Sequence, residues 1–183
     1  MRRISFFVAM CVLASAPAFA QGGAAAAPAS PLTQGDRGAY EMVKGYIVKA
    51  AEQVPENLYA FKATAEVRSF GQLVAHIADS NYMICSAAAA ETAPGGAIEK
   101  TKTAKADLAT ALAASFAYCD KVWSATTDAS GAKAVKMPFG PEMPRLSALS
   151  FNTAHDFEHY GNLVTYMRLN KMVPPSSQPQ GMR

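Results

Sequence analysis

The stretch SFNTAHDFEHYGNLVTYMRLNKMVPP, residues 150–175, predicts a long helix that carries chemically active side chains on one face. Apolar residues, amides and histidines recur in it every three or four positions, which is the period of an α-helix. We expect the helix to run from about Arg145 to about Lys171, because Pro174 and Pro175 cannot continue it. The face that we expect to point inward consists of Leu149, Asn152, His155, His159, Asn162, Leu163 and Tyr166.

Two histidines on this face, His155 and His159, are one helical turn apart. Their side chains therefore leave the same side of the helix, with Cβ atoms about 5–6 Å apart. Two imidazoles at this separation can bind one metal ion. The same spacing also occurs in helices where one histidine is solvated and the other is hydrogen-bonded, so the pair alone leaves both interpretations open.

Residues 155–159, HDFEH, also fit the H-x-x-E-H pattern of a class of zinc proteases, in which Glu158 would act as the general base. That pattern needs an acidic third ligand further along the chain. The sequence after His159 contains no aspartate or glutamate, and no strands of the kind used by such proteases are evident. We therefore do not expect a protease of this class.

Three more helices are expected ahead of this one. Ser69 followed by Gln72 forms the capping-box pattern typical of a helix start. The stretches 92–100 and 128–144 contain proline and glycine and are expected to be loops, and no alternation typical of strands is evident. Four long amphipathic helices in one domain predict an all-α fold, a four-helix bundle. Apolar residues at helical spacing place the first three helices at about residues 35–54, 69–91 and 101–127.

The second expected helix carries His76, the third histidine of the chain, on an otherwise apolar face. A histidine that is buried there needs a polar partner. Together with His155 and His159 it can supply three nitrogens to one ion and leave a fourth position open, as in catalytic zinc sites. Asp79 follows His76 by one turn and is either a base for such a site or an ordinary polar residue of the helix.

Polar neighbours of the histidines are candidates for supporting roles. Asn152 and Asn162 flank the ligand face and can hold an imidazole or a substrate. Asp156 and Glu158 each point about 100° away from an adjacent histidine, which favours the outer face or a supporting contact for both.

The segments SFGQLVAHIADSNYMI, residues 69–84, and 150–175 resemble the DinB-like superfamily of four-helix proteins, which place one histidine on the second helix and an HxxxH pair on the fourth. The resemblance implies an up-down-down-up bundle in which His76, His155 and His159 bind a divalent metal ion, zinc or nickel most commonly. It also implies the activities known in the superfamily, which include thiol-cofactor-dependent transferases and an isomerase.

One stretch departs from the pattern of this superfamily. Many relatives follow the last ligand with a basic residue, a glycine and a glutamine, whereas this chain has Tyr160, Gly161 and Asn162. Asn162 can take over the role of the amide. This chain lacks the basic residue at that position. An anionic substrate, which the resemblance to the family would otherwise imply, therefore has no support from this stretch.

The amino-terminal residues 1–20 have the features of a secretory signal peptide. A basic start is followed by a short apolar run and by small residues before a cleavage site after Ala20. The run falls short of the roughly 20 apolar residues that span a bilayer. We expect a flexible Ala/Pro/Gly linker at 21–33, a helical domain at 34–175, a disordered tail at 176–183, and export across an inner membrane to the periplasm.

Composition narrows the possible partners. The formal net charge of the 183 residues is +3 and falls towards zero without the arginines of the leader, so neither nucleic acid nor an anionic membrane is an expected partner. The mature chain is expected to have no membrane span, and a homodimer is compatible with its sequence. Cys85 and Cys119 form a disulfide or are small buried residues, and no CxxC motif indicates redox catalysis.

These observations favour an exported, divalent-metal-binding protein that acts on a small molecule. The expected activity is a metal-dependent hydrolase or a group (thiol) transferase with three histidine ligands and an open coordination position. A non-catalytic helical module that binds a metal or a ligand is the alternative, and a bundle that buries its histidines without metal is a third possibility.

Overall fold

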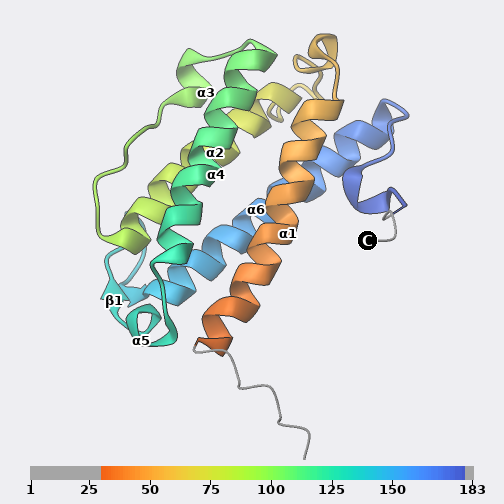
Figure 1. Ribbon diagram of the computed structural model, residues 1–183. Coiled ribbons are helices and arrows are strands. Elements are labelled where there is room, and N and C mark those ends of the chain that lie inside the picture. The colour runs from red at the N-terminus through yellow and green to blue at the C-terminus, as the bar shows by residue number, and fades with distance from the viewer. Residues whose placement is uncertain (1–29, 180–183) are drawn as a thin grey trace, which may run out of the picture.

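The computed structural model of the protein describes residues 30–179, and the expected signal peptide and most of the expected linker lie outside these residues. Helices dominate the described chain, which confirms the all-α fold (Figure 1). None of the helices in this part is both long and apolar enough to cross a lipid bilayer. The helices are α1 (Pro31–Gln53), α2 (Phe70–Ala89), α3 (Ile98–Thr101), α4 (Lys105–Ser124), α5 (Asp128–Gly131) and α6 (Arg145–Leu169).

The helices α2 and α4 lie side by side and run in the same direction. The amide of Asn81 donates to Ser115 Oγ over 3.3 Å, and one turn further along both helices Cys85 and Cys119 form a disulfide. A step of four residues along α2 therefore corresponds to a step of four residues along α4, so the two helices are parallel. The disulfide also decides between the two interpretations of the cysteines, because both side chains are buried and bonded to each other.

A second parallel pair consists of α1 and α6. Ser150 Oγ donates to Asp36 near the start of both helices. Further along, the rings of Tyr46 and Tyr160 stack with centroids 5.2 Å apart. This pair closes the other side of the bundle (Figure 1).

The two pairs run in opposite directions. Asn152 of α6 donates to Asn81 of α2 over 2.9 Å. His76 precedes Asn81 in α2, yet it lies beside His159, which follows Asn152 in α6. The helices α2 and α6 are thus antiparallel. The four long helices follow the up-down-down-up order, as the resemblance implied.

The start of α1 differs from the expectation, since the helix begins at Pro31, within the stretch expected to be linker. Ser30 makes no side-chain cap. The carboxylate of Asp128, at the start of α5, instead accepts hydrogen bonds from the Thr33 N–H and hydroxyl, both over 2.8 Å, and from the Leu32 N–H over 3.3 Å. A residue almost a hundred positions away therefore satisfies the free N–H groups of this helix end.

Two connections and the carboxyl-terminal segment also differ from the expectation. The third long helix begins at Lys105, because the separate helix α3 occupies residues 98–101 of the region before it. The expected loop at 128–144 contains α5 and two short antiparallel strands, β1 (Ala134–Val135) and β2 (Met143–Pro144). The expected tail is ordered as far as residue 179, where Ser176 hydrogen-bonds to the Tyr160 hydroxyl over 2.9 Å.

Candidate metal centre

The three histidines of the chain come together between α2 and α6. Their nearest nitrogens all lie within 4.8 Å of one another. His155 Nε2 and His159 Nε2 are 3.0 Å apart, a distance that the one-turn spacing allows. The ring of His76 lies perpendicular to that of His159, with centroids 4.7 Å apart, and 5.3 Å from that of His155. We refer to these three residues as the histidine triad.

The environment of the triad favours the neutral form of all three imidazoles. Burial lowers the pKa of His159 to about 4, with further contributions from His155, His76 and the Arg68 guanidinium. Burial also lowers the pKa of His155, helped by His76. Burial and Arg68 lower the pKa of His76, partly offset by the carboxylate of Glu99. Neutral imidazole is the form that binds metal, so this donor set fits a divalent ion.

Contacts at the far ring nitrogens orient two of the rings. Glu99 Oε2 lies 3.6 Å from His76 Nδ1. The side-chain amide of Asn162 lies 3.4 Å from His159 Nδ1, and a flip of this amide presents its oxygen to an Nδ1–H. The Glu99 contact favours protonation of His76 at Nδ1, and the Asn162 contact does the same for His159 when the amide is flipped; each then leaves the Nε2 lone pair for a metal. His155 Nδ1 is buried and has no hydrogen-bond partner among residues 30–179.

Two residues at this site carried no signal in the sequence. Glu99 Oε1 accepts from Arg68 Nε over 2.9 Å, and the backbone carbonyl of Arg68 accepts from the Tyr166 hydroxyl over 2.7 Å. Arg68 precedes α2 and Glu99 begins α3, so only the folded chain brings them to the triad. Arg68 thereby supplies a positive charge near the histidines, although Tyr160 stands where many relatives have a basic residue.

Asp79 was expected to be either a base or an ordinary polar residue of its helix, and the structure gives it a structural contact. Its two carboxylate oxygens accept hydrogen bonds from the backbone N–H groups of Ile98, over 2.8 Å, and Glu99, over 3.0 Å. The carboxylate therefore holds the start of α3 and with it the residue that orients His76. Its role as a base stays a prediction.

The polar residues expected around the triad divide between two places. Asn162 contacts His159, and Glu158 is exposed and acts on His155 through its charge. Asn152 instead donates to Asn81 and, over 3.3 Å, to the carboxylate of Asp156 in the core. It is fully buried and makes no hydrogen bond to the triad within the described residues.

Asp156 corrects one expectation from the sequence. It was expected on the outer face or in a supporting contact to the site, but it is wholly buried on the core side of α6. Burial raises the pKa of its carboxyl well above the ordinary value. The physical reason is its position one step from His155, which turns it from the triad towards the interior of the bundle.

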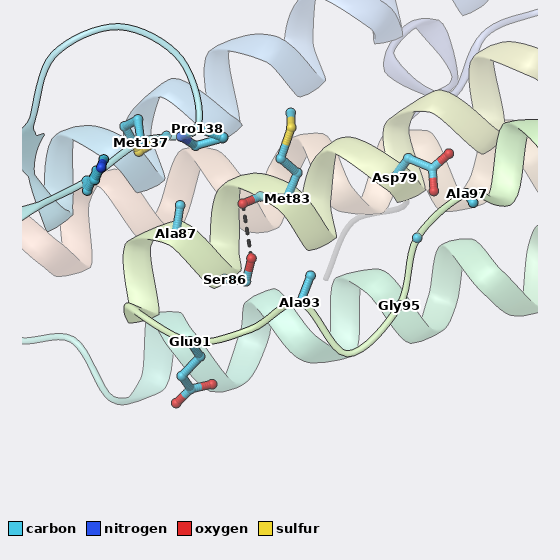
Figure 2. Close-up of a pocket in the computed structure, with 12 residues that line it drawn as sticks. Asp79, Met83, Ser86, Ala87, Glu91, Ala93, Gly95, Ala97, Met137 and Pro138 are labelled. Carbon is cyan, nitrogen blue, oxygen red and sulfur yellow. Dashed lines mark hydrogen bonds between the residues drawn. The ribbon is translucent and has the colours of Figure 1, made fainter.

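A groove with a volume of about 540 Å³ follows the outer face of α2, and none of the three histidines lines it (Figure 2). One side is formed by the loop after α2 and the other by the segment after β1. The groove includes Asp79, which follows His76 by one turn on the same face. Its lining also includes Met83, Ala87, Gly95, Met137 and Pro138.

The chain resembles known proteins both in family and in fold. Residues 39–163 match the family model described as the DinB superfamily. A comparison with curated proteins found no match. Several solved structures are similar in fold, at sequence identities that support the fold alone.

A DinB-like protein from Bacillus cereus is 17% identical with a TM-score of 0.68, and the match covers 78% of this chain and 95% of that one. A DinB-like protein from Bacillus subtilis is 17% identical with a TM-score of 0.63, covering 80% and 99%. A mycothiol-dependent maleylpyruvate isomerase is 16% identical with a TM-score of 0.60, covering 72% of this chain and 60% of its own.

Proposed function

The chain belongs to the DinB superfamily, and on that basis we propose that it is an exported, metal-dependent enzyme, a hydrolase or a group transferase. The observation that carries this proposal is the histidine triad, whose nitrogens lie within 4.8 Å of one another. Three neutral imidazoles on two helices are the ligand set of a catalytic site, because a tetrahedral ion then keeps one position for a small molecule.

His76, His155 and His159 would hold the ion, and we propose zinc or nickel, both of which suit imidazole ligands. When bound, a divalent ion supplies Lewis-acid chemistry, which acidifies a coordinated group and polarises a substrate oxygen. Glu99 would fix the ring of His76, and Asn162 that of His159, so that both rings keep their Nε2 atoms directed at one point. Arg68 would attract an electron-rich group of the substrate to the same place.

Between the two activities, hydrolysis has more support. The similar isomerase is named as mycothiol-dependent, which brings thiol transfer into consideration for this fold. Low-molecular-weight thiol cofactors, however, belong chiefly to the cytosol. The leader-like residues 1–20 and the bond between Cys85 and Cys119 both support an exported protein in an oxidising compartment such as the periplasm.

The test measures metal in protein purified from the periplasm without added metal or a histidine tag. We expect close to one divalent ion per chain in the wild type and in Glu158→Gln, an exposed neighbour of the triad. His155→Ala should lose the ion, because two imidazoles bind far more weakly than three. Equal absence of metal from the wild type and His155→Ala would refute the metal site.

Catalysis is tested separately by turnover with panels of hydrolase and thiol-transfer substrates. We expect turnover that needs the ion and is lost in His155→Ala. A protein that holds its metal fully and turns over nothing in either panel would instead be the non-catalytic binding module.

A further inference from the structure

The groove along α2 extends away from the triad as an apolar surface. Met83 follows His76 by two helical turns, so it lies on the same face about 10 Å further along the helix axis. Ala87 lies one turn beyond Met83, and Met137 and Pro138 face the groove from the segment after β1 (Figure 2). Beyond Asp79, these side chains give the groove a wall of carbon and sulfur.

The helix α6 adds an aromatic side chain at the same level. Because α2 and α6 are antiparallel and Asn81 contacts Asn152, residues just after Asn81 lie opposite residues just before Asn152. By this register, Met83 of α2 and Phe151 of α6 lie at the same level of the bundle. Phe151 in turn packs against Phe139, with ring centroids 5.4 Å apart.

These apolar side chains stay open to solvent. Met83 is 40% exposed, Phe139 39% and Phe151 42%, although they come from three separate elements. Single exposed apolar residues are ordinary, whereas several that converge beside a polar cluster mark a binding surface. Phe151 precedes His155 by one turn on the same side of α6, so this surface is continuous with the triad.

The opposite side of the triad is polar. Arg68 and Glu99 form an ion pair there, and Asn162 lies against His159. The site thus has a charged end, three metal-binding nitrogens in the middle, and an apolar end.

We propose that this site takes an amphipathic small molecule, whose polar head lies at the metal and whose alkyl or aryl group lies over Met83 and Phe151. The inference rests on the proposed metal-dependent function and adds the class of substrate. The apolar part of the groove ends where Glu91 and Lys136 line it, which limits the length of the chain that it can bury.

The experiment uses the metal-loaded, full mature protein and a series of alkyl hydroxamic acids from acetohydroxamic to octanohydroxamic acid. The hydroxamate head is a metal chelator and is constant, so the series varies only the apolar tail. Each methylene that becomes buried should tighten binding about fourfold. We expect octanohydroxamate to bind the wild type at least about tenfold more tightly than acetohydroxamate, measured by calorimetry.

The variants Met83→Gln and Phe151→Gln should remove most of this dependence on chain length and leave acetohydroxamate binding within about twofold of the wild type. Phe157→Gln is the matched control, because Phe157 lies on the same helix with 39% exposure but on another face. It should keep the wild-type ratio. Equal ratios in Phe151→Gln and Phe157→Gln, or equal affinities across the series in the wild type, would overturn the inference.

The metal content of every sample separates the two proposals. Full metal, tight acetohydroxamate binding and no effect of chain length would overturn only the apolar subsite. Absence of metal would overturn the proposed function, and the subsite inference with it.

Discussion

At the scale of single residues, the geometry of the triad depends on side chains that are not its members. Glu99 lies between Arg68 and His76, and its backbone N–H is held by the carboxylate of Asp79. A shift of any of these groups changes the orientation of the His76 ring. Substitutions beside the triad should therefore alter metal affinity without removing a ligand.

Glu99→Gln removes the negative charge next to His76 Nδ1. We expect metal affinity to fall by about 10- to 100-fold, because a carboxylate partner orients a ligand imidazole and makes it more basic. Competition with a chromophoric chelator measures this dissociation constant. Glu158→Gln, on the exposed side of α6, is the control and should change affinity little. Unchanged affinity in Glu99→Gln would show that the contact has no role in binding.

Asp79→Ala leaves the N–H groups of Ile98 and Glu99 without their acceptors. We expect the free energy of unfolding to fall by about 1–3 kcal/mol, the range for lost hydrogen bonds to a charged group. Asp79→Asn keeps one acceptor oxygen and should lose less, as urea denaturation will measure. The predicted role as a base is tested in the same Asp79→Asn protein: normal turnover at full metal content would exclude it.

At the scale of the elements, helix ends are fixed by distant partners as well as by neighbours in sequence. The start of α2 follows the local pattern, since Ser69 and Gln72 form the predicted capping box. The start of α1 does not, because its cap is Asp128 of α5. This contact fastens α1 to the connection between α4 and α6.

Asp128→Ala should lower the melting temperature by about 2–5 °C at neutral pH, the usual effect of losing a helix cap in a domain of this size. Hydrogen bonds from the backbone and hydroxyl of Thr33 lower the pKa of Asp128 in the folded state. The stabilisation is therefore present above the unfolded-state pKa and is lost as the pH falls through the folded-state pKa.

Melting curves from pH 7 down to pH 2 will measure this dependence. The difference between the wild type and Asp128→Ala should shrink at the acidic end, where the carboxylate is protonated in both states. Glu142→Ala, an exposed acidic residue in the loop before β2, should show no comparable difference. A difference in melting temperature between the wild type and Asp128→Ala that stays constant with pH would contradict a charged cap.

At the scale of the whole molecule, the disulfide joins the two central parallel helices. Cys85 and Cys119 are separated by 34 residues, and their bond closes the crossover that contains α3. Because α3 carries Glu99, the same closed loop also holds a residue of the site.

Replacing Cys85 and Cys119 together by alanine should lower the free energy of unfolding by about 3–4 kcal/mol, the value that chain entropy gives for a loop of this length. Chemical denaturation of the double variant and of the oxidised wild type measures this difference. The reduced wild type should resemble the variant. Identical denaturation midpoints with and without reductant would mean that the bond is not formed in the isolated protein.

Helical periodicity was sufficient for the existence of the four long helices and for the shared face of His155 and His159, since both are local properties. Their ends were less predictable: α1 starts at Pro31, where a distant carboxylate replaces the missing local cap. The predicted position of Asp156 was wrong for a related reason. Polarity favours an outer position for aspartate, but the rotation of α6 set by packing directs it into the core.

Local sequence patterns are enough to predict the all-α class, the helix that presents two histidines on one side, and the position of His76 on another helix face. These follow from the periodicity of a single helix, which needs no knowledge of its neighbours. The groups that surround the triad, in contrast, are set by the packing of the folded chain. Arg68 and Glu99 come from connections, and Phe151 of α6 lies at the level of Met83 of α2 because the two helices pack antiparallel. Contacts between distant segments depend on how helices pack, and packing is a property of the whole chain.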